Sequence, residues 1–145
     1  WHYKSKDGLM AAALTEYIET WRAWFLETVE ERADPGEASL RAFFGILQDW
    51  LGDQEFGGCL AMQALVEFED GTHPLHALAR AHLESVQKFL AEHARRAKAA
   101  QPTALARQLL CLAQGAILLA RAGNGKTAGK EARNAAKLLI ADALP

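Results

Sequence analysis

Residues that favour β-strands are scarce in this chain of 145 residues. Valine and isoleucine number seven together, whereas alanine is abundant and half of all residues are hydrophobic. β-branched side chains are restricted in helices and suit strands, and alanine is the best helix former. No segment has the alternating pattern of a strand, and no internal repeat is present. The composition therefore predicts an all-α fold in one compact domain.

Cysteines and long apolar runs are also few, and each shortage excludes a class of protein. Cys59 and Cys111 lack CxxC spacing and are too few for a disulfide framework, which fits a reducing cytoplasm. The longest apolar run covers residues 109–120. It is shorter than the ~20 residues of a membrane-spanning helix, and no signal-peptide pattern precedes it. We therefore expect a cytoplasmic protein with no membrane partner.

Motifs for nucleotide and nucleic-acid binding are incomplete. The segment GNGKT, residues 123–127, has Ala120 where a phosphate-binding loop needs glycine, and it follows a predicted helix rather than a strand. We interpret it as the end of one helix and the start of another that is capped by Thr127. The net charge of -2 gives no overall attraction to nucleic acid, so any DNA contact must be local or lie outside this segment.

The histidines do not form a recognisable catalytic or metal-binding set. His73 and His76 make an HxxH pair without a cysteine partner, which is a weak pattern for zinc. An enzyme that uses His82 with Glu67 or Glu84 is a minor alternative, because the sequence has no Ser/His/Asp set and no paired-carboxylate motif. We predict no enzyme activity, no cofactor and no metal site.

The spacing of apolar residues predicts about six helices, and no proline interrupts them. The first begins at Ser5, a good N-cap, with Asp7 in its first turn. Pro35, Pro74 and Pro102 stand where one segment ends or the next begins. The predicted helices cover residues 5–32, 37–52, 59–69, 74–99, 102–122 and 127–144.

Large aromatic side chains gather in the first half of the chain, and small residues fill much of the second half. The aromatic half suits a cavity, in which His82 would be a polar group on an apolar helix face. The small residues allow close helix–helix contact, either within the chain or with a second copy. Cys111, in the apolar fifth helix, is interpreted as a small core residue.

The opening stretch WHYKSKDGL, residues 1–9, resembles the end of the DNA-binding helix-turn-helix in the TetR family of bacterial transcriptional repressors. In that family an aromatic-rich run closes the recognition helix, and a Ser-Lys-acid-x-Leu pattern opens the long helix that follows. GGCLAMQALVEFEDGTHPLHALARAHL at 57–83 and LARQLLCLAQGAILLARAG at 105–123 resemble segments of the family's C-terminal domains. The resemblance implies a helical bundle whose last two helices form a dimeric four-helix bundle with a second copy.

The resemblance also implies two functional parts. Residues 1–6 would be the tail of a helix-turn-helix domain whose remainder precedes Trp1, and residues 7–145 would be the ligand-binding and dimerisation domain. Double-stranded operator DNA would be bound through that N-terminal domain. A few side chains at its end would contact phosphates, which position a protein on DNA without reading its sequence. These side chains are His2, Lys4 and Lys6, and Trp1 would pack at the DNA backbone beside them.

The resulting hypothesis is a ligand-responsive repressor, a homodimer that releases operator DNA when a small apolar or aromatic effector binds. Gln63 and His82 would be the polar contacts to the effector. The candidate ligand-binding residues are Tyr17, Trp21, Trp24, Phe44, Leu47, Cys59, Met62, Gln63, His82, Val86 and Phe89. The candidate dimer-interface residues, in the last two helices, are Leu110, Ala113, Gln114, Ile117, Arg121, Ala135, Leu138 and Leu139.

Two alternatives stay open. Cys59 follows two glycines at a helix start, where the helix dipole favours a reactive thiolate, so an oxidant or electrophile could be the trigger of the same repressor. The chain could also be a stand-alone helical dimerisation or binding module with no DNA role.

Overall fold

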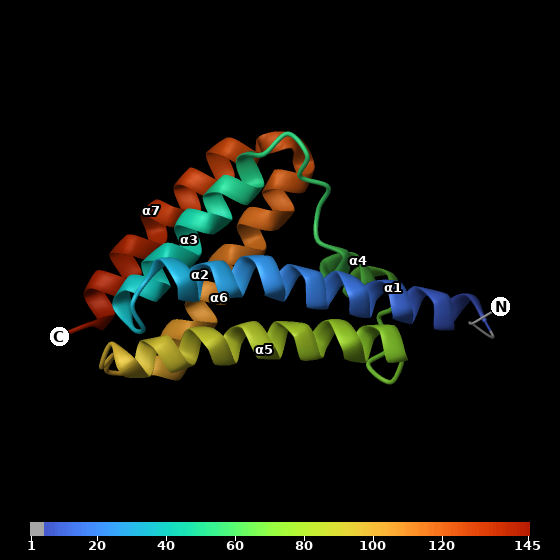
Figure 1. The fold of residues 1–145 in the computed structure, drawn as a ribbon, viewed down its shortest axis with the longest axis horizontal. Helices are drawn as coiled ribbons and strands as arrows, with labels where there is room; N and C mark the ends of the chain where they lie inside the picture. The colour runs from blue at the N-terminus through green and yellow to red at the C-terminus, as the bar shows by residue number, and fades with distance from the viewer. Residues whose placement is uncertain (1–4) are drawn as a thin grey trace.

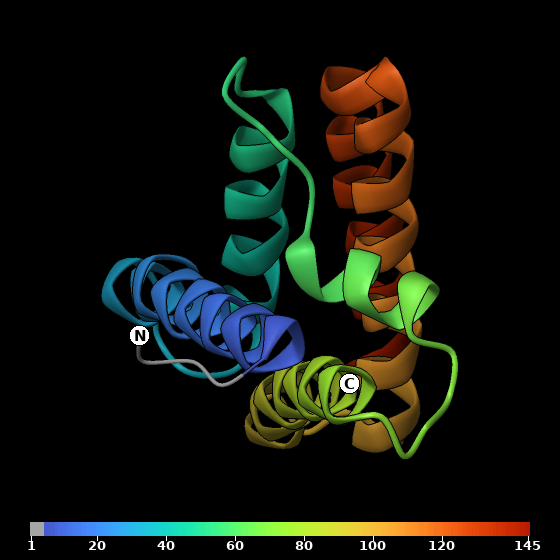
Figure 2. The same cartoon turned by 90° about the vertical axis from the view of Figure 1, so that its right-hand side faces the viewer.

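The structure is a computed structural model, and it describes residues 5–145. Every regular element in that range is a helix, which confirms the predicted all-α fold. The helices form two groups that cross each other. One long helical rod lies beside α5, and α3, α6 and α7 rise from this pair as an upright group (Figures 1 and 2).

The first long helix is one rod made of three segments. α1 (Lys6–Trp21) continues through the π-helical turn η1 (Arg22–Leu26) into α2 (Glu27–Arg32). Ser5 caps the rod as predicted, because the Gly8 N–H donates to Ser5 Oγ at 3.0 Å. The sequence does not predict the π turn, since one wider turn hardly changes an apolar pattern with spacings of three and four. Isolated π turns are frequent at functional sites.

The helix α5 (Pro74–Arg96) lies beside this rod (Figure 1). As predicted, Pro74 occupies its first turn, and the N-cap His73 accepts a hydrogen bond from the Leu75 N–H at 3.1 Å. The helix ends before the predicted residue 99, because Lys98 adopts a left-handed φ of 62° that ends the helical conformation.

The short helix α4 (Leu60–Glu67) packs against α5 and α1, and a loop at 53–59 joins it to α3 (Glu37–Gly52). α4 is shorter at both ends than the predicted 59–69. Cys59 is its N-cap residue with an extended backbone, and Phe68 has a non-helical ψ of 79°.

The last two helices form a hairpin. α6 (Pro102–Leu119) leads through η2 (Ala120–Asn124) into α7 (Gly125–Ala143), and the chain reverses at Gly123, whose φ is 112°. The predicted cap at Thr127 is wrong. The helical conformation resumes at Gly125, so Thr127 lies exposed within the first turn of α7.

Two glycines bring α7 against α3. A Cβ at Gly125 would lie 2.0 Å from the Leu51 carbonyl oxygen, and a Cβ at Gly129 would lie 2.9 Å from Gln48 Cα. No side chain of any size fits at such distances. Small residues of α7 therefore pack closely on α3 within the chain.

By length and composition alone, the helical stretch Pro102–Ala143 could cross a membrane. It folds back at Gly123 and packs on α3 and α5. Helices of buried cores have the same composition, so this feature by itself does not indicate a membrane protein.

The core fills the junction of the two helix groups. Its largest fully buried side chains include Phe25, Phe43 and Phe44. The inner face of α6 adds apolar residues, whereas Cys111 lies on the outer face and is exposed. The prediction of Cys111 as a core residue is wrong, because the apolar sequence of α6 continues onto its exposed face.

Candidate ligand-binding site

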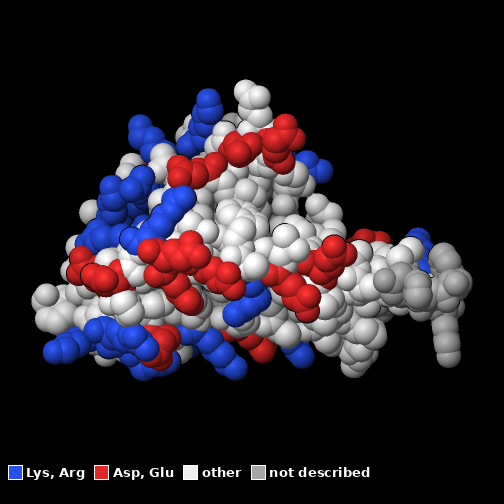
Figure 3. Space-filling model, in the orientation of Figure 1, with Lys and Arg blue, Asp and Glu red and all other residues white. Residues whose placement is uncertain are grey.

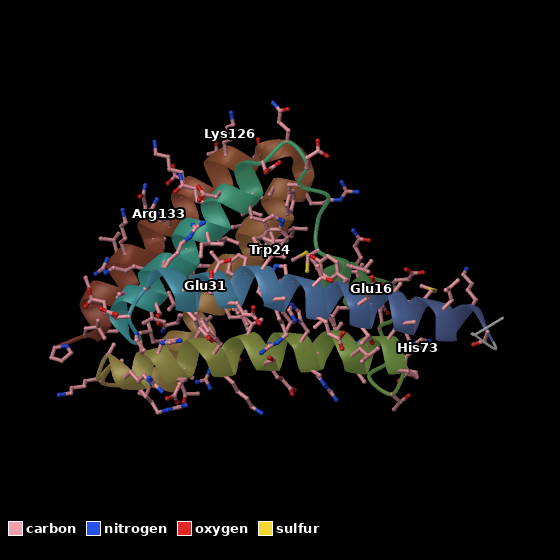
Figure 4. The ribbon with its side chains drawn as sticks, in the orientation of Figure 1. Glu16, Trp24, Glu31, His73, Lys126 and Arg133 are labelled. Carbon is pink, nitrogen blue, oxygen red and sulfur yellow. The ribbon has the colours of Figure 1, made fainter. Side chains whose placement is uncertain are left out.

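A cavity of about 610 Å³ opens between α1, the loop at 53–59 and α4. Its volume lies in the range of small-molecule sites. α1 and η1 supply more than half of its lining, and Figure 4 labels Glu16 and Trp24 along this rod. The lining residues are Ala13, Glu16, Tyr17, Thr20, Trp21, Trp24, Trp50, Gly57, Gly58, Leu60 and Gln63.

Three tryptophans build the wall of this cavity. Trp24 meets Trp50 edge to face at 5.8 Å between ring centroids, and Trp21 lies 6.3 Å from Trp50. Trp21 is 6% exposed and stacks on Phe25 at 4.6 Å, so it also belongs to the core. Trp24 is 39% exposed and offers a free ring surface to the cavity. The wall is therefore rigid at Trp21 and accessible at Trp24.

Tyr17 is a neutral polar group at the same cavity. Its hydroxyl donates to the Gly58 carbonyl oxygen at 3.4 Å, which ties α1 to the loop. Burial raises the pKa of the Tyr17 phenol, and the neighbouring Cys59 raises it further. The hydroxyl is therefore present as a hydrogen-bond donor throughout the physiological pH range.

His82 on α5 lies behind the tryptophan wall. Its ring meets Trp21 edge to face at 5.1 Å, and it is 5% exposed. Among the described residues, no hydrogen-bond partner reaches its Nδ1. Burial, and then the charge of Arg22, lower the pKa of His82 to about 4. The ring is therefore neutral at pH 7 and is separated from the cavity by Trp21.

A known protein family matches most of the chain. Residues 36–136 match the family described as "Tetracyclin repressor-like, C-terminal domain". The chain belongs to the TetR family. This membership confirms the resemblance seen in the sequence and makes the chain a domain of a family of transcriptional regulators.

A solved structure agrees with this TetR-family fold. The crystal structure of a TetR-family transcriptional regulator from Streptomyces coelicolor is similar with a TM-score of 0.84 and 23% sequence identity, over 98% of this chain and 75% of that one. At this identity the likeness concerns the fold alone. No curated protein sequence matches the chain.

The fold of this TetR-family domain brings four of the predicted ligand-binding residues to the cavity. Tyr17, Trp21, Trp24 and Gln63 line it. The other predicted residues lie elsewhere: Phe44, Leu47 and Val86 are fully buried in the core, Cys59 and His82 are buried beside the cavity, Met62 is half-buried on α4, and Phe89 packs on Phe43 and His93.

Sequence reasoning missed Glu16, Thr20 and Trp50 as lining residues. Trp50 belongs to the aromatic group that the sequence shows, but it stands at the end of α3, and only the loop at 53–59 brings it opposite α1. Glu16 is polar, and an apolar pattern gives no reason to select it.

Cys59 is the N-cap residue of α4 and is 6% exposed. A bulky oxidant or electrophile therefore reaches its sulfur only when α4 or the loop before it moves. The HxxH pair does not form a metal site with other groups: within residues 5–145, no cluster of three or more His, Cys, Asp or Glu side chains could hold a metal ion. His73 caps α5, and His76 Nδ1 lies 2.7 Å from the Phe68 carbonyl oxygen.

The outer surface of the α6–α7 hairpin carries an apolar groove of about 840 Å³. Leu119 is 54% exposed beside it, and Leu118 and Leu138 are exposed nearby. Of the predicted dimer-interface residues, Leu138 and Arg121 are exposed and Ala135 and Leu139 line the groove. Leu110 and Gln114 are half-buried, whereas Ala113 and Ile117 face the core of their own chain.

Three of the predicted DNA-contacting residues, Trp1, His2 and Lys4, lie outside the described residues. Lys6 is described. It begins α1 and is exposed.

Proposed function

We propose that this domain binds a small aromatic or apolar effector in the cavity beside α1 and thereby controls the release of operator DNA by a cytoplasmic repressor. The single observation that carries the proposal is the position of the cavity against α1. Tyr17, Trp21 and Trp24 line the cavity and are also residues of the long rod. The N-terminal end of that rod carries the sequence that resembles the end of a helix-turn-helix.

The coupling between the two sites runs along this rod. An effector that requires more room between α1 and the loop at 53–59 would displace α1 and the DNA-binding helices that precede it. Half-sites on DNA are about 34–36 Å apart for a dimer of this kind, so a displacement changes how both recognition helices fit. A coupling free energy of about 1–3 kcal/mol would change DNA affinity by about 5- to 150-fold.

We propose further that the regulator is a homodimer through the α6–α7 hairpin. The exposed leucines and the groove lie on one face of this hairpin. A two-fold symmetric contact would use the same face of each copy, and the four helices would make a bundle. The charged side chains Lys126 and Arg133 lie along another part of α7 (Figure 4).

The test uses N-phenyl-1-naphthylamine, a neutral aromatic probe whose fluorescence rises in an apolar site. We expect it to bind the protein with one site per chain, and we expect Trp24→Ala to weaken this binding about tenfold or more, because the variant removes an accessible ring from the cavity wall. Anisotropy of labelled DNA from the regulator's own promoter region then shows whether the probe weakens DNA binding by the full-length protein.

The comparison variant is Trp50→Phe, which keeps an aromatic ring in the cavity wall and should therefore change probe binding less than Trp24→Ala. Trp21→Ala is a poor test, because a buried Trp21 contributes several of the core contacts and its loss would destabilise the fold. Absence of probe binding to the folded protein, or equal binding by the Trp24→Ala variant, would contradict the proposed effector site.

A further inference from the structure

A second hollow of about 380 Å³ adjoins the cavity, and Trp24 and Trp50 line both. The two tryptophans therefore form a ridge that is accessible from two sides. Trp50 meets Phe56 edge to face at 5.1 Å, which extends the aromatic surface into the loop. A ligand on this ridge contacts ring faces and edges over a wide area.

Carboxylates surround this aromatic surface. Glu16 lines the first cavity, and Asp49, Asp53 and Glu55 line the second. All four are exposed. Figure 3 shows the same face: an uncharged area lies between acidic side chains along the long rod and acidic side chains near the end of α3, and basic side chains gather elsewhere.

Few cations oppose these carboxylates. Arg32 is the only basic residue that lines either hollow within the described part of the chain. Arg121 packs against Gly58 of the loop but lines neither hollow. Arg22 is hydrogen-bonded to Ser85 on α5, on the other side of the rod. An anionic ligand would therefore meet four carboxylates and one guanidinium.

We propose that the effector is a lipophilic organic cation, such as an aryl- or alkyl-substituted quaternary ammonium or phosphonium ion. Its charge would rest against the faces of Trp24 and Trp50, with Glu16 as the nearest counter-charge on α1. Aromatic ring faces attract cations, and most strongly when the ring is tryptophan. The apolar body of the ligand would fill the cavity under the loop. This inference rests on the proposed function of the cavity, and it names the chemical class of its ligand.

The neutral polar groups fit this class as well. Tyr17 donates its hydroxyl to the Gly58 carbonyl, so its oxygen keeps a lone pair that can accept a hydrogen bond from a protonated amine. Gln63 offers an amide oxygen at the same wall. No group at the cavity is a fixed anion receptor, since a guanidinium or ammonium group does not line it among the described residues.

The test compares tetraphenylphosphonium and tetraphenylborate, which are nearly equal in size and opposite in charge, with neutral triphenylphosphine oxide, which carries one phenyl group fewer. Each displaces N-phenyl-1-naphthylamine from the folded protein at low ionic strength. We expect tetraphenylphosphonium to bind about tenfold more tightly than the oxide, and tetraphenylborate to bind more weakly than the oxide. Glu16→Gln should weaken the phosphonium about two- to fivefold and leave the oxide unchanged.

The matched control is Glu19→Gln, which removes an exposed charge from the same helix away from the cavity lining. It should leave all three affinities unchanged. Equal affinity for the phosphonium and the oxide, or an equal effect of Glu16→Gln and Glu19→Gln, overturns the inference and leaves a neutral effector site. If the naphthylamine itself does not bind, the proposed effector site fails as well, so the two failures are distinguishable.

Discussion

At the scale of single residues, the domain holds polar groups that stay uncharged. His82 is buried against Trp21, and no group within residues 5–145 is a hydrogen-bond partner for its Nδ1. Tyr17 is tied to the loop through a neutral hydroxyl. A buried nitrogen without a hydrogen-bond partner costs free energy, and a positive charge on the ring at the same place would cost more. His82 therefore makes the stability of the fold depend on pH in a defined direction.

We predict that acid destabilises the domain through His82. Its pKa is about 4 in the folded protein and ~6.5 in the unfolded chain, so the unfolded chain binds the proton first as the pH falls. Its contribution to stability is complete above pH ~6.5 and is lost as the pH falls toward 4. Between pH 7 and pH 5 the free energy of unfolding should fall by roughly 2 kcal/mol from this group.

Urea titrations of the wild type and of His82→Leu measure the contribution of His82 to the free energy of unfolding. Both proteins are measured at pH 7 and at pH 5, at one protein concentration. The variant should lose about 2 kcal/mol less than the wild type between the two pH values. The pKa of His93 is also lowered, chiefly by burial, so the variant keeps some pH dependence. An identical pH dependence of both proteins would show that His82 is not held neutral by the fold.

At the scale of helices, the contact between α7 and α3 depends on glycine. Gly125 and Gly129 are four residues apart and lie on one face of α7, next to the backbone of α3. The close contact buries backbone against backbone and leaves no space for a Cβ. This contact fixes the angle at which the hairpin leaves the domain, and with it the position of the apolar groove.

We predict that Gly129→Ala destabilises the domain by about 1–2 kcal/mol, because overpacking outweighs the better helix propensity of alanine. Gly125→Ala should cost more, since its Cβ would meet the Leu51 carbonyl oxygen at 2.0 Å. Thermal and urea unfolding measure the stability of both variants.

The control is Gly45→Ala on α3, whose Cβ would have ordinary contacts with Arg133 at 3.7 Å. Gly45→Ala should be neutral or stabilising, and a stabilising Gly129→Ala would contradict the close contact.

At the scale of the whole molecule, the cavity and the apolar groove lie on different parts of the fold. The rod, the end of α3, the loop at 53–59 and α4 enclose the cavity, whereas the α6–α7 hairpin exposes apolar side chains beside the groove. Large exposed apolar patches on soluble domains commonly mark contacts with partners. The proposed partner is a second copy, placed so that each α6–α7 hairpin covers the groove of the other.

We predict that Leu138→Glu and Leu119→Glu weaken a homodimer of the domain by at least about a hundredfold in dissociation constant, since a symmetric interface carries each change twice. Sedimentation equilibrium should give about twice the 15.9 kDa of one chain for the wild type. Both variants should shift toward the monomer mass at micromolar concentration.

Val66→Glu is the control, because Val66 is 73% exposed on α4, outside the hairpin. It should keep the mass of the wild type. A monomeric wild type, or variants that keep the dimer, would place the interface elsewhere.

Local features of the sequence are sufficient to predict much of the fold. Ser5 and Pro74 mark their helix starts as expected, because caps and first-turn prolines act within one turn. The end of α5 depends on a left-handed φ at Lys98, which a lysine in the sequence does not signal. Gly123 does signal a chain reversal, but it does not fix the residue at which α7 begins. The sequence also identifies the aromatic half of the chain as the cavity-forming half.

The sequence by itself determined the helical class, the helix starts with strong caps, the TetR resemblance and the set of aromatic side chains. Only the tertiary structure decided which of these rings reach solvent. Phe44 and Trp24 are both large aromatic residues in predicted helices, yet Phe44 is buried in the core and Trp24 lines a cavity. The reason is physical: periodicity defines a face of one helix, but a cavity needs faces of several elements together. The crossing of the rod with the upright group and the path of the loop at 53–59 bring them together.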